Sequence, residues 1–170
     1  THLMIEAMKR AYADRARYLG DGPKSEETAQ RMIKKSHAAD LRAQIDMTRA
    51  TPADAIQPMA REGGNTTHYS VIDKDGNAVA NTTTLNFGYG LGMVADGTGV
   101  LLNNELDDFT AAAGASNAYG LVSFEANLPG PGKRPLSSMT PTIVLKDGKA
   151  WLVTGSPGGS RIISAVMQVI

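Results

Sequence analysis

The sequence contains no cysteine, and this absence excludes several kinds of protein. A disulfide scaffold, a zinc site with cysteine ligands, an iron–sulfur cluster and a thiol nucleophile all need this residue. The apolar runs are only a few residues long, far short of the roughly 20 residues that a transmembrane helix needs. Lysine plus arginine and aspartate plus glutamate both number 17, so no excess of positive charge favours a nucleic-acid partner.

Histidine is scarce as well. His2, His37 and His68 are far apart in the sequence, and no His-x-x-x-His pair occurs, so we expect no metal site. The 170 residues suit one domain or part of a larger one. A helical pattern starts at residues 3–8 without a leader, and residues 160–170 end on an apolar residue without a helix stop signal. We therefore expect a segment of a longer protein.

The first third of the chain has the composition of helices. Residues 1–60 carry most of the Ala, Lys, Arg and Glu. Apolar residues at helical spacing, with suitable end signals, predict three helices, over about residues 3–19, from Ser25 to Lys35, and over about 37–46. Gly20 is predicted as the C-cap of the first helix. Two prolines interrupt residues 48–64, which we interpret as an exposed linker.

The rest of the chain predicts strands and turns. Two Asp-Gly-containing turns, each between apolar and β-branched runs, predict hairpins over residues 66–85 and 142–154. Between them, residues 100–102 read as a further strand after a glycine-rich stretch. Residues 155–160 contain three glycines and lead from the last strand into a helix. Together with the helical part, this predicts an α+β fold.

The junction between linker and strands is the first candidate for chemistry. Asn65 is followed by Thr66 and Thr67 at the start of the first predicted strand. A threonine released at an N-terminus is a complete catalytic unit, because its hydroxyl is the nucleophile and its α-amine is the base. The partner strand carries three threonines, at 82–84, so a second hydroxyl can lie beside the first.

Three further stretches carry polar groups that could bind a substrate. Residues 103–109 hold three carboxylates and two amides, which suit an ammonium group. Residues 133–141 hold a Ser-Ser pair after Lys-Arg, which suits a carboxylate. The glycines of 155–160 offer backbone N–H groups near a helix N-terminus, which suit an oxyanion. Alone, each stretch is also compatible with an ordinary loop.

Taken together and in order, these stretches resemble γ-glutamyltranspeptidase. The resemblance rests on Thr-Thr-His-Tyr-Ser at 66–70, Leu-Leu-Asn-Asn-Glu-Leu-Asp-Asp-Phe at 101–109, Lys-Arg-Pro-Leu-Ser-Ser-Met at 133–139 and Gly-Ser-Pro-Gly-Gly-Ser at 155–160. The helical Ala-Tyr-Ala-Asp-Arg at 11–15 resembles the end of that family's large subunit. The likeness covers nearly the whole chain.

The resemblance implies an N-terminal-nucleophile hydrolase with an αββα sandwich, here partial, with antiparallel sheets and flanking helices. It implies a precursor that cuts itself between Asn65 and Thr66. Residues 1–65 are then the helical end of the large subunit plus a linker, and residues 66–170 begin the small, catalytic subunit. Membership of this family also implies no cofactor and an exported, periplasmic or secreted protein.

The resemblance also assigns roles to single residues. Thr66 matches the nucleophile and Thr84 the supporting hydroxyl. Gly158 and Gly159 match the oxyanion hole. The remaining matches bind the γ-glutamyl donor: the ammonium end by Asn86, Glu105 and Asp108, the carboxylate by Ser137 and Ser138, and Tyr119 as a lid. An arginine that completes the donor site in this family lies upstream of the sequence given.

The implied reaction is a two-step acyl transfer. Thr66 takes the γ-glutamyl group from glutathione or a related donor and passes it to an amino acid, a peptide or water. Two alternatives stay open. An acylase of the same fold would act on glutaryl or cephalosporin side chains, which lack the ammonium that Glu105 and Asp108 would bind. An uncleaved precursor or a non-catalytic fragment would leave the amine of Thr66 in a peptide bond.

Overall fold

The computed structural model describes residues 1–52 and 65–170, which form two compact units. The first unit joins Thr1–Ala60, as far as it is described, with Asp108–Leu136. The second joins Arg61–Asp107, as far as it is described, with Ser137–Ile170. The division into these two units differs from the predicted division into subunits after residue 65. That boundary is defined by a cut in the chain and not by compactness, so it stays a prediction.

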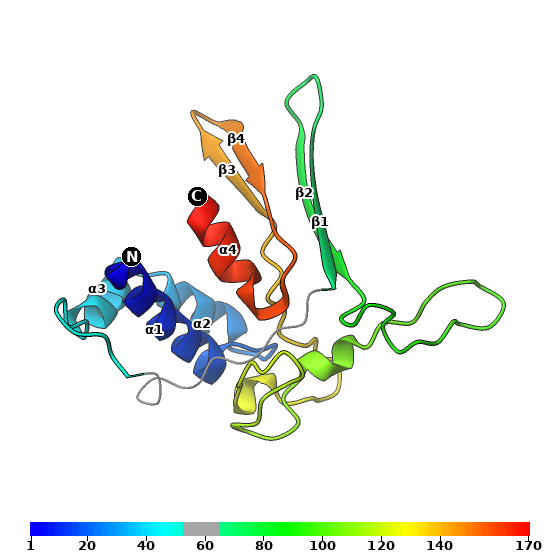
Figure 1. Ribbon diagram of the computed structural model, residues 1–170, viewed down its shortest axis with the longest axis horizontal. Coiled ribbons are helices and arrows are strands. Elements are labelled where there is room, and N and C mark those ends of the chain that lie inside the picture. The colour runs from blue at the N-terminus through cyan, green and yellow to red at the C-terminus, as the bar shows by residue number, and fades with distance from the viewer. Residues whose placement is uncertain (53–64) are drawn as a thin grey trace. The chain divides into compact units, whose positions relative to one another are not determined.

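Three helices open the first unit, as the sequence predicts. They are α1 (His2–Tyr18), α2 (Ser25–Met32) and α3 (Lys35–Ala43). Figure 1 shows α1 and α2 against α3. The extension of the second helix to Lys35 is wrong, because Lys34 has an extended backbone (φ −66°, ψ 139°) and Lys35 begins α3. Most of the predicted linker, residues 53–64, lies outside the described residues.

A charged side chain lies at the centre of the helical part. Glu6 of α1 is fully buried and accepts hydrogen bonds from Thr51 Oγ1 at 2.6 Å, Arg10 Nη1 at 2.7 Å and Lys9 Nζ at 2.9 Å. The bond from Thr51, followed by those from Lys9 and Arg10, holds the pKa of the Glu6 carboxyl well below its usual range. Glu6 therefore fastens residue 51, next to the predicted linker, onto α1.

Gly20 has another function than the predicted one. The C-cap of α1 is Leu19, and Gly20 instead packs against the short helix η3 (Glu125–Asn127). A Cβ at Gly20 would stand 2.0 Å from the carbonyl oxygen of Ala126. Glycine is required here because two backbone segments approach closely, and this contact joins α1 to the second part of its unit.

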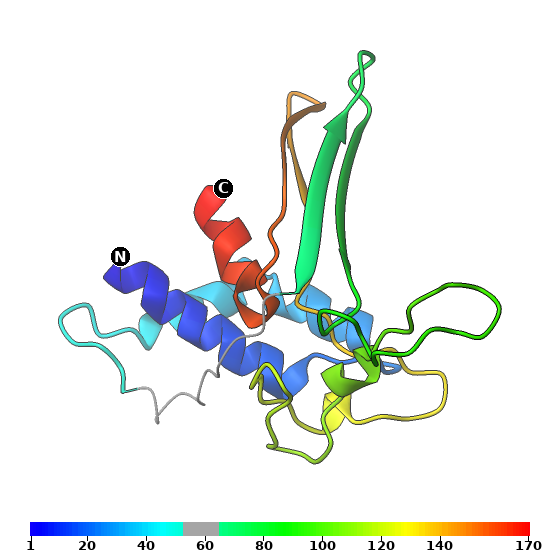
Figure 2. The ribbon, with the colours of Figure 1, turned by 45° about the vertical axis from the view of Figure 1, so that its right-hand side comes forward.

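Two antiparallel hairpins dominate the second unit, as predicted. Strands β1 (Thr66–Ile72) and β2 (Ala78–Thr84) form one, and β3 (Thr142–Lys146) and β4 (Lys149–Thr154) form the other. Figure 2 shows them as long ribbons side by side. Asp147 and Gly148 have φ of 53° and 76°, the left-handed pair that a two-residue hairpin turn needs.

The strand predicted at residues 100–102 is wrong. Leu101 forms only an isolated bridge with Val94, and Val100 is 58% exposed. Gly97 and Gly99 both have a φ of +72°, so the chain curls between the two bridge residues instead of extending. The glycine-rich stretch is thus a projecting loop.

The last element begins where the sequence predicts a strand-to-helix turn. After β4, residues 155–158 lead into a short η4 (Gly159–Arg161) and then α4 (Ile162–Val169). Ile162 and Val166 bury the apolar face of α4, with 1% and 4% of their surfaces exposed. Within the described parts of the chain, none of the helices has the length and apolar character needed to cross a membrane.

Candidate active site

Thr66 and Thr84 stand opposite each other at the open end of the first hairpin. Thr66 is the first residue of β1, and the antiparallel register pairs it with Thr84, the last residue of β2. The Thr84 hydroxyl donates to the carbonyl oxygen of Asn65 at 3.2 Å and accepts the N–H of Asn86 at 2.9 Å. The structure therefore brings a polarising hydroxyl to the carbonyl of the Asn65–Thr66 peptide bond, the bond that the family resemblance predicts to be cleaved.

Asn86 ties this hairpin to the acidic segment. Its backbone has a φ of 76°, unusual for a residue with a side chain, and only 3% of its surface is exposed. Its side-chain amide donates to the carbonyl of Asn104 at 3.0 Å, and the side chain of Asn104 accepts the N–H of Phe87 at 2.9 Å. These bonds fix the backbone just before Glu105, so Thr66, Thr84, Asn86 and Glu105 belong to one unit.

Gly158 directly precedes η4, and Gly159 is its first residue. Their φ values are 129° and 53°, and side-chain-bearing residues rarely adopt either. The N–H of Arg161 donates to the carbonyl of Gly158 at 3.0 Å, which closes the turn. The first N–H groups of a helix lack partners within the helix and can stabilise a negative oxygen. This geometry suits the predicted oxyanion role.

His68 links the two hairpins, a role that the sequence does not predict. Its Nδ1 lies 2.7 Å from Thr82 Oγ1 and its Nε2 lies 3.0 Å from Ser70 Oγ, which donates to the carbonyl of Val153 at 3.1 Å. Because the Ser70 proton goes to that carbonyl, Nε2 of His68 donates to Ser70 Oγ, and in the neutral imidazole Nδ1 is then the acceptor for the Thr82 hydroxyl. The sequence signal for this contact is the spacing of His68 and Ser70, because residues two apart in a strand lie on the same face.

Gly155, at the end of β4, makes room for this histidine. A Cβ at Gly155 would stand 2.2 Å from both Cε1 and Nδ1 of His68. The glycine motif therefore has two separate requirements: close packing at Gly155 and left-handed backbone at Gly158 and Gly159.

Asp108 and Tyr119 belong to the helical unit. Asp108 ends η2 (Glu105–Asp108), and its carboxylate lies 3.5 Å from the side-chain amide of Asn117. Burial lowers the pKa of the Arg15 guanidinium, and the nearby charges of Tyr12 and Asp108 oppose this shift. Tyr119 is 7% exposed and sits in a turn held by Asn117.

Ser137 and Ser138 follow a firmly anchored loop. Ser137 is exposed, and its hydroxyl accepts the N–H of Met139 at 3.1 Å. In the helical unit, Asp21 accepts the backbone N–H and the Nε of Arg134, both at 2.9 Å. These bonds, the side-chain one foremost, lower the pKa of Asp21 to about 2. The backbone three residues before Ser137 is thus fixed.

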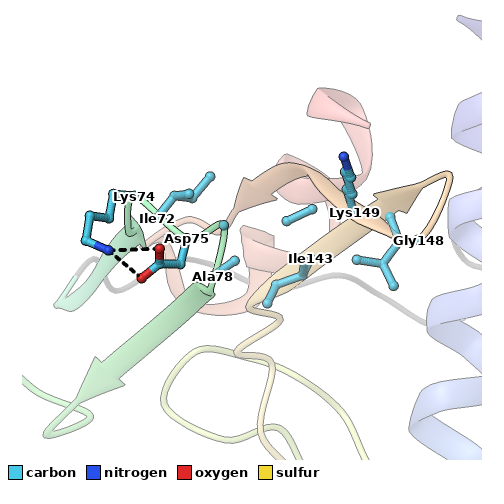
Figure 3. Close-up of a pocket in the computed structure, with 10 residues that line it drawn as sticks. Ile72, Lys74, Asp75, Ala78, Ile143, Gly148 and Lys149 are labelled. Atoms are coloured by element: carbon cyan, nitrogen blue, oxygen red, sulfur yellow. Dashed lines mark hydrogen bonds and ion pairs between the residues drawn. The ribbon is translucent and has the colours of Figure 1, made fainter.

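A pocket of about 670 Å³ lies at the turn ends of the two hairpins. Figure 3 shows the lining residues of this pocket, which include Ile72, Lys74 and Ala78 from the first hairpin and Ile143 and Lys149 from the second. Thr66 begins β1 and Ile72 ends it, so the strand places the pocket about 20 Å from Thr66 at about 3.3 Å per residue. The pocket is therefore separate from the candidate active site.

Among residues 1–52 and 65–170, no three His, Asp or Glu side chains gather as metal ligands would.

Known proteins match this chain along nearly its whole length. The family model described as Gamma-glutamyltranspeptidase matches residues 1–170. The glutathione hydrolase proenzyme of Escherichia coli is 56% identical over 99% of this chain and 30% of its own length. That of Pseudomonas sp. (strain A14) is 54% identical over 98% of this chain and 29% of its own. The chain thus spans about 30% of the length of these curated relatives.

Solved structures show the same relationship. The Helicobacter pylori gamma-glutamyltranspeptidase T380A mutant is 60% identical, with a TM-score of 0.59, over 61% of this chain and 55% of its own. The enzyme of Pseudomonas nitroreducens complexed with L-DON is 56% identical, with the same TM-score, over 61% of this chain and 53% of its own. The chain belongs to the gamma-glutamyltranspeptidase family.

Proposed function

We propose that the protein containing this chain transfers γ-glutamyl groups from glutathione and related donors through an acyl-enzyme on Thr66. The observation that carries the proposal is the position of Thr84, opposite Thr66, with its hydroxyl on the carbonyl of Asn65. This arrangement occurs in a chain that the gamma-glutamyltranspeptidase family model matches over residues 1–170.

Self-cleavage comes first in this proposal. The Thr66 hydroxyl attacks the carbonyl carbon of Asn65, and the Asn65–Thr66 amide becomes an ester while the α-amine of Thr66 is freed. Water then hydrolyses the ester. Negative charge develops on the Asn65 oxygen in the first step, and the Thr84 hydroxyl already donates to that oxygen. The products are two subunits, the second beginning with Thr66.

Donor turnover then uses the same hydroxyl. The freed α-amine takes the proton from Thr66 Oγ, which attacks the γ-carbonyl and expels the amine of cysteinylglycine. The N–H groups of the Gly158–Gly159 turn stabilise the oxyanion. Glu105 and Asp108, with Asn86, bind the donor's ammonium, and Ser137 and Ser138 bind its carboxylate. An amino acid, a peptide or water receives the glutamyl group from the ester.

The names of the relatives support the substrate and the precursor. The Escherichia coli relative is named a glutathione hydrolase proenzyme. A solved structure of an acivicin-inhibited gamma-glutamyltranspeptidase assigns roles in autoprocessing and catalysis to that protein's C-terminus. We extend both properties to the protein that contains this chain, and its subunits are then partners of each other.

The hairpins support the finer fold assignment. Large apolar side chains on the strands are more than half exposed, among them Val71, Ile72, Val79, Leu145 and Trp151. The chain covers about 30% of its relatives, so other parts of the parent protein can cover these residues. We propose that they complete an αββα sandwich, and that the parent protein is exported to the periplasm or the medium.

The direct test replaces Thr66 in the full-length precursor. Thr66→Ala should abolish both self-cleavage and glutathione turnover, while Thr67→Ala, whose side chain points to the other face of β1, should retain both. Gel electrophoresis follows cleavage, and release of cysteinylglycine follows turnover. An uncut Thr66→Ala protein that still turns over glutathione would refute the proposal. Preference for a glutaryl anilide over a γ-glutamyl anilide would instead favour an acylase.

A further inference from the structure

Asn127 joins the two ends of the segment that separates the donor-binding groups. This segment, Asp108–Leu136, is the second part of the helical unit. The side-chain amide of Asn127 donates to the carbonyl of Asp108 at 2.7 Å, and its oxygen accepts the N–H of Leu136 at 3.0 Å. The same amide lies 3.4 Å from Thr110 Oγ1. One side chain thus bonds the first and the last residue of the segment.

The surroundings of Asn127 keep this side chain in place. Only 2% of its surface is exposed. Lys133 Nζ donates to the carbonyls of Ala126 and Leu128, the residues on either side. Gly20 packs against the backbone of Asn127, since a Cβ at Gly20 would stand 2.9 Å from the backbone N of Asn127. A buried amide with all its bonding groups in use holds its partners at fixed separations.

Of the two residues that Asn127 connects, one is itself a proposed donor-binding group and the other directly precedes one. Asp108 is a proposed acceptor for the donor's ammonium, and Leu136 directly precedes Ser137, a proposed donor to its carboxylate. In a γ-glutamyl group the ammonium and the carboxylate sit on the same carbon. The two binding groups must therefore keep one separation for both bonds to form together.

We propose that Asn127 is a positioning residue that holds Asp108 and Leu136, the residue directly before Ser137, at a fixed separation, and thereby selects donors with a free α-amino acid end. This inference rests on the proposed function. Asn127 acts through the backbones of Asp108 and Leu136 and does not touch the reacting atoms.

The test compares two donors in the full-length protein. Kinetics with a γ-glutamyl anilide and a glutaryl anilide give a ratio of kcat/KM values that does not depend on how much enzyme is active. Asn127→Leu removes all three bonds at similar volume, and Asn127→Ser keeps a smaller polar group. Asn77→Leu is the matched control, because the side-chain amide of Asn77 donates to Asp73 within an exposed hairpin turn.

We expect Asn127→Leu to raise KM for the γ-glutamyl anilide and to lower the γ-glutamyl to glutaryl ratio by about tenfold, with a smaller effect for Asn127→Ser and none for Asn77→Leu. Equal losses toward both donors with unchanged KM, or complete inactivity of both Asn127 variants, would make the residue purely structural and overturn the inference. A wild-type protein without activity on the γ-glutamyl anilide would refute the proposed function instead.

Discussion

Replacing Gly155 by alanine tests the contact that joins the two hairpins. The new Cβ would stand 2.2 Å from the His68 ring, which Thr82 and Ser70 hold at 2.7 and 3.0 Å. The ring must move, so both hydrogen bonds weaken in addition to the overpacking. Overpacking costs about 1–3 kcal/mol, and the two weakened hydrogen bonds together lose about 1 kcal/mol. We therefore expect Gly155→Ala to destabilise the protein by about 2–4 kcal/mol.

A double-mutant cycle shows whether this cost comes from His68. Urea unfolding of the full-length protein is measured for Gly155→Ala, His68→Ala and the combination. Since removal of the imidazole leaves room for the new methyl group, the double mutant should be more stable than the sum of the single effects by about 1–3 kcal/mol. Gly22→Ala, whose Cβ would meet nothing within 4 Å, should change stability by less than about 0.5 kcal/mol. Strictly additive effects would refute the reasoning.

Two further substitutions test other parts of the structure. Glu6 has a lowered pKa, so its ionised form stabilises the fold fully above the ordinary pKa of 4.5, and this contribution disappears as the pH falls toward the folded-state value. Glu6→Gln should therefore lower the unfolding temperature at pH 7, with a difference from wild type that shrinks below pH 4.5; a constant difference from pH 7 to 3 would contradict this. Thr84→Val, which removes the hydroxyl bonded to the Asn65 carbonyl, should slow self-cleavage about a hundredfold, as followed by electrophoresis of fresh precursor; an unchanged rate would exclude the polarising role.

Local patterns account for the elements that the sequence predicts well. The hairpin turns could be found because Asp147 and Gly148 favour the left-handed backbone that such turns need. The register that places Thr66 opposite Thr84 follows once the turn at residues 73–77 is fixed. The strand at 100–102 was mispredicted because a short apolar run such as Val-Leu-Leu occurs both in strands and in projecting loops.

Contacts between distant parts of the chain could not be predicted. Glu6 resembles any surface glutamate on a helix until Thr51 is seen to bond to it. Asn127 likewise lies in a stretch without a sequence motif, and its importance depends on partners at Asp108 and Leu136. Propensity and periodicity describe neighbours in sequence, and they carry no information about which side chain meets which backbone group across the fold.

Modification by a substrate analogue tests whether Thr66 is the nucleophile that self-cleavage exposes. The full-length protein is incubated with an electrophilic glutamine analogue, denatured, and its chains are weighed by mass spectrometry with peptide mapping. The account predicts two chains, with one adduct on the chain that begins at Thr66 and the modification on that threonine. A single uncut chain, or an adduct on any other residue, would contradict it.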